Sequence, residues 1–115
     1  HPACSIVGHP TGRLLLKREG SQLDMPQLIE WAVEHNTAIE INANPLRLDL
    51  DWRHGNKAWE TGLLSSINPD AHTTDGIDHI HYGVRIARKA KFGADRILNT
   101  KSADELAQWF RERNQ

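Results

Sequence analysis

The sequence predicts an α/β fold in which short parallel strands alternate with helices. Three short apolar runs are each followed by Gly, Pro, Asn or Asp, which is typical of buried strands that end in a turn. The ends of these runs are about 30 residues apart, the length of one strand-helix-strand unit. Amphipathic segments fill the intervals. Three such units in series predict parallel strands joined by right-handed crossovers.

The first half of the chain contains two predicted strands and one helix. Residues 3–7 form a short apolar run that Gly8-His9-Pro10 stops, so they predict a buried strand. A helix is expected to begin near Asp24, which forms a capping-box-like pair with Gln27. Residues 38–43 predict the second strand, ended by Asn44-Pro45.

The second half repeats the alternation of strand and helix. A helix is expected over residues 53–61, with Gly62 directly after its end, and a third strand over residues 63–67. The pattern predicts a helix over residues 79–91 and a last helix that reaches residue 113. Ser102 and Glu105 have the spacing of a capping box at the start of that last helix.

Composition excludes several classes of protein. The chain has 115 residues, enough for one compact domain or a piece of one, and no apolar run exceeds three residues, so no membrane span or signal peptide is predicted. The formal net charge of −1 gives no basic surplus, so any nucleic-acid binding must rest on a local site. Cys4 is the single cysteine, which fits a cytoplasmic protein.

Three parallel strands are too few to bury both faces of their sheet well, and a closed eight-stranded barrel takes about 250 residues. We therefore expect the chain to be the carboxyl-terminal part of a larger α/β domain. The alternative is a small open α/β sandwich that is complete in itself.

Polar residues follow all three predicted strands, in segments 8–13, 42–45 and 68–72. The carboxyl ends of parallel strands meet at one edge, where α/β folds carry their chemistry. Asp70 and His72 are two residues apart in extended backbone, so both can reach one metal ion, and mixed oxygen and nitrogen donors suit Zn, Mn or Fe. The alternative is a turn in which His72 lies in solvent. His9, at a neighbouring strand end, adds weight to the metal site.

Other polar residues have structural interpretations beside the functional ones. Arg13 follows a Thr-Gly turn and suits either a phosphate contact or a plain surface position. Glu40 is interpreted as a member of a structural ion pair, and Trp52, in a loop, as a residue that can stack on a substrate. We interpret a group of cations as complementing a helix dipole rather than following a nucleic-acid backbone: Arg85, Arg88, Lys89 and Lys91. A further group is interpreted as capping and surface residues, with Asp78 as the N-cap: Asp75, Asp78, His79 and His81.

Common nucleotide-binding, hydrolase and protease motifs are absent, including the P-loop, G-x-G-x-x-G, G-x-S-x-G and H-E-x-x-H. Other motifs, in order and spacing, resemble the end of a PHP (polymerase and histidinol phosphatase) domain, of the variant appended to bacterial family X DNA polymerases. They are Gly8-His9-Pro10-Thr11-Gly12-Arg13, Glu40-Ile41-Asn42-Ala43-Asn44-Pro45, Arg47-Leu48-Asp49-Leu50 and Asp70-Ala71-His72. Tyr82-Gly83-Val84, Ala87-Arg88 and Ile97-Leu98-Asn99-Thr100 resemble its closing segment, so the resemblance covers essentially the whole chain.

The resemblance implies a distorted seven-stranded, TIM-like (β/α) barrel, of which residues 1–115 would be the carboxyl-terminal part. It implies up to three divalent metals, Zn or Mn, that activate water for phosphoester cleavage, seen in such polymerases as 3′-5′ exonuclease or DNA-end phosphoesterase activity. Carried over to this chain, the metal ligands would be His9, Asp70 and His72, and Arg13 stays a candidate for a phosphate contact.

The early H-x-H motif and other upstream ligands of the family are absent from this chain. The parent protein, which acts on DNA, is therefore expected to be the enzyme. The isolated chain, without the amino-terminal part of the domain, is expected to bind metal weakly, to lack activity and to self-associate through open strand edges. The alternatives are a stand-alone phosphatase for a small phosphomonoester and a non-catalytic module that supports a polymerase.

Overall fold

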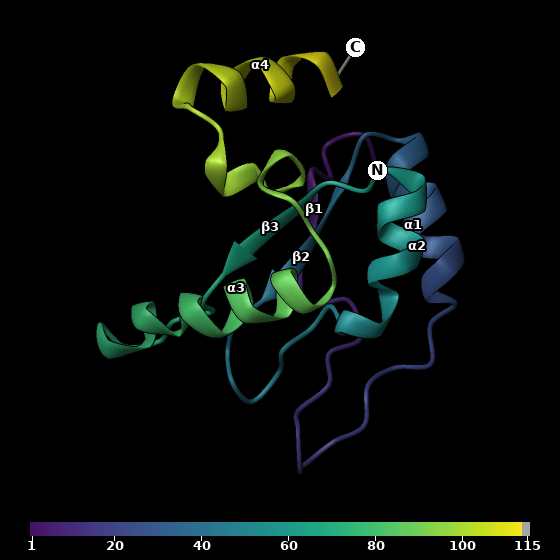
Figure 1. Ribbon diagram of the computed structural model, residues 1–115. Coiled ribbons are helices and arrows are strands. Elements are labelled where there is room, and N and C mark those ends of the chain that lie inside the picture. The colour runs from purple at the N-terminus through teal and green to yellow at the C-terminus, as the bar shows by residue number, and fades with distance from the viewer. Residues whose placement is uncertain (114–115) are drawn as a thin grey trace.

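The structure, a computed structural model that describes residues 1–113, is built on a three-stranded parallel sheet (Figure 1). Its strands lie side by side in chain order: β1 (Ile6–Val7), β2 (Ala38–Asn42) and β3 (Ser65–Asn68). Ile6 pairs with Ala38, and Ile39 pairs with Ser65, so all three carboxyl ends point toward one edge. The predicted α/β class with parallel strands is confirmed.

Helices connect and cover these strands. The α-helices are α1 (Met25–Glu34), α2 (Gly55–Thr61), α3 (Ile80–Lys89) and α4 (Ala103–Arg113). Short 3₁₀ segments lie between them: η1 (Trp52–His54), η2 (Asp75–His79), η3 (Ala94–Arg96) and η4 (Leu98–Thr100). Within residues 1–113, none of the helices has the length and apolar character needed to cross a membrane.

The predicted helix signals have the expected geometry. The Asp24 carboxylate accepts a hydrogen bond from the backbone N–H of Gln27 at 3.0 Å and begins α1. Ser102 and Glu105 exchange both bonds of a capping box at the start of α4. Gly62 ends α2 with a φ of 80°, in the left-handed region that glycine adopts without a steric penalty.

Several element boundaries differ from the sequence expectation. β1 contains two residues rather than the five of segment 3–7. β3 begins at residue 65 rather than 63, because the N–H of Leu63 still bonds to the end of α2, at the carbonyl of Ala58. The prediction of Asp78 as an N-cap is wrong: it lies inside η2, since a turn between Thr73 and Gly76 already winds the chain there. α3 then covers residues 80–89 instead of 79–91.

One face of the sheet is apolar and packs against α1, α2 and α3. Ile39 and Ile41 of β2 and Ile67 of β3 supply this face, and all three are buried. α3 lies directly on the strands at Gly83, where a Cβ atom would overlap Ile67 and Ala43. These contacts fix the sheet against its helices and leave its second face to serve another purpose.

The second face changes character along the strands. At its amino end, Ala38, Leu98 and Trp109 form a small buried apolar cluster beneath α4. Toward the carboxyl end the same face carries polar residues, because side chains alternate between the two faces of a strand: Glu40, Asn42, Ser66 and Asn68. Buried faces of parallel sheets are ordinarily apolar. The polar half of this face therefore indicates a functional site at the carboxyl end of the sheet.

The outer edge of β3 is closed by a side chain. Asn99 accepts a hydrogen bond from the N–H of Ile67 at 2.7 Å and donates one to the carbonyl of the same residue at 2.8 Å. The amide of Asn99 thus takes the place of a neighbouring strand, next to the isolated bridge between Ser65 and Ile97. β1, at the other end of the sheet, is paired on one side by β2.

We predict that Asn99→Ala lowers the free energy of unfolding by about 2 kcal/mol, because both main-chain groups of Ile67 lose their partner. Denaturant unfolding followed by circular dichroism measures the change. Asn56→Ala, an exposed residue on α2, is the matched control and should be nearly neutral. Equal stability of the two variants would contradict this role of Asn99.

Candidate functional site

The centre of the polar half-face is the carboxylate of Glu40. Its Oε1 accepts a hydrogen bond from the side-chain amide of Asn68 at 2.9 Å, across the pairing of β2 with β3. Its Oε2 accepts from the backbone N–H of His9 at 2.6 Å and lies 3.3 Å from the amide nitrogen of Asn42. A single carboxylate therefore joins the ends of all three strands. The prediction that Glu40 forms an ion pair is wrong, because its partners are neutral donors.

Asp70 reaches the same cluster from the end of β3. The amide nitrogen of Asn42 that contacts Glu40 also donates to Oδ2 of Asp70, at 3.2 Å. The Nε atom of Arg47 lies 3.2 Å from that oxygen, so the carboxylate of Asp70 is ion-paired. The structure thus brings the backbone of His9 and the carboxylate of Asp70 to one edge of the sheet, linked through Glu40 and Asn42. We call Glu40, Asn42, Asn68 and Asp70 the carboxyl-edge cluster.

The two predicted histidine ligands are exposed. The ring Nδ1 of His72 lies 2.9 Å from the carbonyl oxygen of Asp70, which folds the ring back on its own turn. His9 has a positive φ of 24°, so the loop after β1 turns sharply at this residue. These two rings extend from the loops that border the carboxyl-edge cluster and are accessible from solvent.

A second carboxylate, Asp49, holds the loop that follows β1. It is fully buried, and its Oδ2 accepts hydrogen bonds from the N–H and hydroxyl of Thr11 and from the N–H of Gly12, at 2.9–3.0 Å. Gly12 has a φ of 66°, which allows its N–H to point at the carboxylate. The other oxygen, Oδ1, is buried without a hydrogen-bond partner in the described chain. Asp49 therefore positions the loop that carries His9 and Arg13.

Arg13 is held on three sides by the segment that follows β2. Its Nε donates to the carbonyl of Arg47 at 2.8 Å, one terminal nitrogen pairs with Asp51 at 2.7 Å, and the other donates to the carbonyl of Leu48. A phosphate at Arg13 would share a guanidinium that these partners already use. Hydrogen bonds from Arg53, together with those from Arg13, hold the pKa of the Asp51 carboxyl well below its ordinary value of 3.8, against the opposing effect of burial.

The donors at the edge do not complete a metal site among residues 1–113. No three His, Cys, Asp or Glu side chains in this part of the chain lie close enough together to hold an ion. Asp70 also faces the cation of Arg47, with which a metal would compete. A structural site needs about four ligands, so a metal bound by His9, Asp70 or His72 would require donors from outside the chain. The acids and histidines of segment 75–81 lie on η2 and at the start of α3.

Sequence reasoning did not find the roles of several residues that build this site. The sequence places Asn42 and Asn68 in the polar segments at the sheet edge, and Arg47 and Asp49 in a family motif, without indicating a role for any of the four. The signal lay in the alternation of Ile39, Glu40, Ile41 and Asn42, which places two polar side chains on the face opposite two buried apolar ones. The partners of each polar residue depend on contacts between distant segments, which no local pattern encodes.

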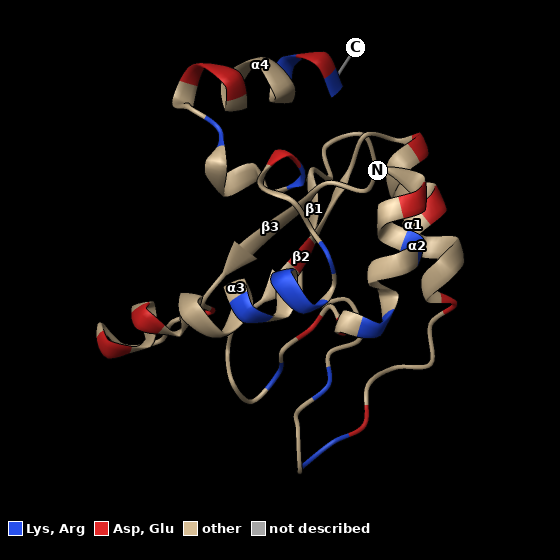
Figure 2. Ribbon diagram, in the orientation of Figure 1, with Lys and Arg blue, Asp and Glu red and all other residues tan. Residues whose placement is uncertain are grey.

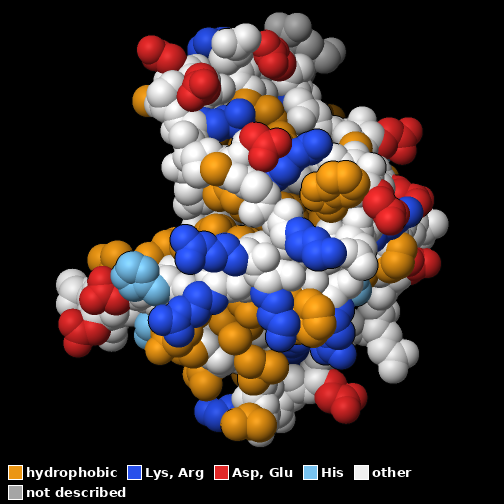
Figure 3. Space-filling view, in the orientation of Figure 1, with side chains coloured by type: hydrophobic (Ala, Val, Ile, Leu, Met, Phe, Trp, Pro, Cys, Tyr) orange, Lys and Arg blue, Asp and Glu red, His pale blue; other side chains and the backbone are white. Residues whose placement is uncertain are grey.

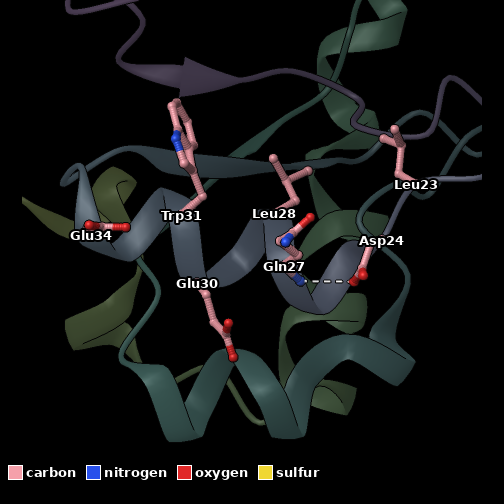
Figure 4. Close-up of a pocket in the computed structure, with 7 residues that line it drawn as sticks. All are labelled: Leu23, Asp24, Gln27, Leu28, Glu30, Trp31 and Glu34. Carbon is pink, nitrogen blue, oxygen red and sulfur yellow. Dashed lines mark hydrogen bonds between the residues drawn. The ribbon is translucent and has the colours of Figure 1, made fainter.

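A depression along α1 has no lining residue in common with the carboxyl-edge cluster (Figure 4). Leu28 and Trp31 project to one side of the helix, whereas Glu30 points toward α2 and pairs with Lys57. Its lining contains neither a histidine nor a basic residue. This depression therefore offers little chemistry of its own.

Comparison with known proteins gives a relationship over most of the chain. No family model matches the sequence. The chain is 46% identical over 101 residues, or 88% of its length, to the DNA polymerase/3′-5′ exonuclease PolX of Bacillus subtilis (strain 168). The chain is related to a region of PolX. It spans 18% of the length of that protein, so the region that it matches is a small part of PolX.

We predict that the ion pairs of Asp51 make the free energy of unfolding depend on pH in the acid range. Because the pKa of this carboxyl is lower in the folded than in the unfolded chain, it stabilises the fold at any pH above about 3.8. That contribution is lost progressively as the pH falls below this value toward the folded pKa. Thermal unfolding of the wild type and of Asp51→Asn should therefore differ most at neutral pH and converge in acid. A difference between them that does not depend on pH would contradict the assignment.

Proposed function

We propose that this chain forms the carboxyl-terminal part, residues 1–115, of a PHP-type phosphoesterase domain in a PolX-like protein that acts on DNA ends. The observation that carries the proposal is the 46% identity to PolX over 88% of the chain. The polar edge supports it, since parallel α/β folds bind and transform substrates at the carboxyl ends of their strands. Because bacterial DNA lies in the cytoplasm, the proposed role implies a cytoplasmic location.

In this proposal, His9, Asp70 and His72 supply part of a ligand set that the rest of the parent protein completes. The divalent ions, Zn or Mn, would activate water and neutralise charge on the phosphate. The chain's own contribution is positioning. Asp49 holds the loop of His9 and Arg13, and Arg47 and Asn42 orient the carboxylate of Asp70. Arg13 remains a candidate for contact with a phosphate oxygen.

A scaffold without catalytic function is the second candidate. The ion pair between Arg47 and Asp70 favours it, because a cation already neutralises the carboxylate that a metal would need. The two candidates differ in one respect that can be measured. A phosphoesterase loses activity when a ligand is removed, whereas a scaffold has no metal-dependent activity to lose.

We predict that His72→Ala, in the complete parent protein with Mn²⁺, lowers degradation of DNA from the 3′ end by about 100-fold, because a ligand to the catalytic ion is lost. A 3′-end degradation assay on labelled DNA measures the change. His81→Ala, an exposed histidine on α3, is the matched control and should retain full activity. Absence of Mn²⁺-dependent hydrolysis, or full activity of His72→Ala, would refute the proposal.

We also predict that the isolated chain self-associates. β1 is paired on one side by β2, and an unpaired strand edge recruits a further strand. Sedimentation analysis over a range of concentrations should detect dimers or larger species. A monodisperse monomer at high concentration would contradict this prediction. It would also argue against the idea that another part of the parent protein covers the unpaired edge of β1.

A further inference from the structure

α3 and the residues after it carry cations without any acid. Between Asp78 and Asp95 the sequence contains no Asp or Glu, but it contains Arg85, Arg88, Lys89 and Lys91. All four are exposed. The whole chain has a net charge of −1, so this segment concentrates positive charge that the remainder of the molecule offsets. Figure 2 shows acidic positions on α1, η2 and α4, whereas α3 carries basic ones.

Some basic residues elsewhere in the described chain are paired with acids, whereas these cations have no acidic partner. Lys57 pairs with Glu30, and Arg53 pairs with Asp51. In contrast, no side-chain hydrogen bond or ion pair to the rest of residues 1–113 engages Arg85, Arg88 or Lys91. Their side chains are therefore available to an anionic partner.

Two exposed aromatic rings border the cations. The Nζ atom of Lys89 lies 4.1 Å from the centre of the Trp52 ring, which brings η1 beside the end of α3. Trp52 is 40% exposed and Tyr82, on the first turn of α3, is 44% exposed. Tyr82, Arg85 and Lys89 are three and four residues apart, so they share one face of the helix.

The length of this stripe suits a short stretch of single-stranded nucleic acid. Lys89 lies seven positions after Tyr82 on the helix, about 10 Å at 1.5 Å per residue. Three steps between stacked nucleotides, at about 3.4 Å each, cover about the same distance. Space-filling Figure 3 shows Lys and Arg side chains gathered over α3 beside hydrophobic ones. Surfaces that bind single-stranded nucleic acid typically combine cations, which contact the phosphate backbone, with aromatic rings, on which the bases stack.

Stabilisation of the helix dipole explains only part of this pattern. Arg88 and Lys89 lie in the last turn of α3, where cations are favourable. Arg85 lies a turn earlier, and Lys91 lies beyond the end of the helix. The dipole also gives no reason for Trp52, an apolar ring from another segment, to be exposed beside Lys89.

We propose that the face formed by Tyr82, Arg85, Arg88, Lys89 and Trp52 binds single-stranded DNA, with the phosphates on the arginines and bases stacked on the rings. This face is separate from the carboxyl-edge cluster. The proposal rests on the proposed function for the choice of DNA as the polyanion. It adds a surface that holds the strand outside the site of hydrolysis.

Binding of a short fluorescein-labelled oligothymidylate to the 115-residue chain, measured by fluorescence anisotropy in EDTA, tests the proposal. We expect Arg85→Gln and Arg88→Gln each to weaken binding about threefold and, together, about tenfold. The double variant should also reduce the slope of log K against log salt by about 1.4. Each phosphate that a side chain neutralises on a single strand releases counterions and contributes about 0.7 to this slope. Trp52→Ala should weaken binding about tenfold with an unchanged slope.

The matched control is Arg111→Gln. Arg111 is an exposed arginine on α4, so this substitution removes the same charge from another element. It should leave the affinity almost unchanged. A loss as large as that of Arg85→Gln would overturn the proposal, because net charge would then explain the binding. So would an unaltered affinity in Trp52→Ala, or equal competition by polyglutamate, which would indicate an acidic protein partner.

The experiment distinguishes this inference from the proposed phosphoesterase function. EDTA removes divalent ions, so binding to the α3 face is measured without hydrolysis. Loss of binding in these variants supports the surface whatever the activity of the parent protein. Unaltered binding overturns the surface and leaves the result of the His72→Ala assay to decide the phosphoesterase.

Discussion

The candidate site depends on one half-buried network of hydrogen bonds around the carboxylate of Glu40. This carboxylate accepts from the backbone of His9 after β1 and from the amide of Asn68 at the end of β3. It lies on β2, between the two. Hydrogen bonds to a charged acceptor are about twice as strong as neutral ones. The three strand ends are therefore held in register at the edge where the chemistry is proposed.

The sheet divides its two faces between stability and function. The face of Ile39, Ile41 and Ile67 packs against helices and supplies the core. The opposite face is apolar beneath α4 and polar at the carboxyl end. Asp49 extends the polar region outward by holding the loop after β1. The carboxylates of Glu40 and Asp49, each of which accepts several hydrogen bonds, thus replace apolar packing where loops must be positioned.

The sequence was sufficient for the elements whose signals are local. Hydrophobic runs predicted the strands, and the caps at Asp24 and at Ser102 with Glu105 marked the starts of two helices. It was insufficient for Asp78, because the tight turn of η2 competed with a regular N-cap. It also missed two partners of Glu40, His9 and Asn68, which lie about 30 residues away along the chain. A pattern of residue types determines the face of a strand, but tertiary contacts determine what a polar side chain meets there.

The most direct test of the account is nuclear magnetic resonance spectroscopy of the amide of His9. We predict that this amide proton exchanges slowly with solvent, and that Glu40→Gln accelerates its exchange and shifts the side-chain amide resonances of Asn42 and Asn68. Glu34→Gln, which removes an exposed carboxylate at the end of α1, should change none of them. A His9 amide that exchanges as fast as a free loop amide in the wild type, and is indifferent to Glu40→Gln, would contradict the convergence of the strand ends.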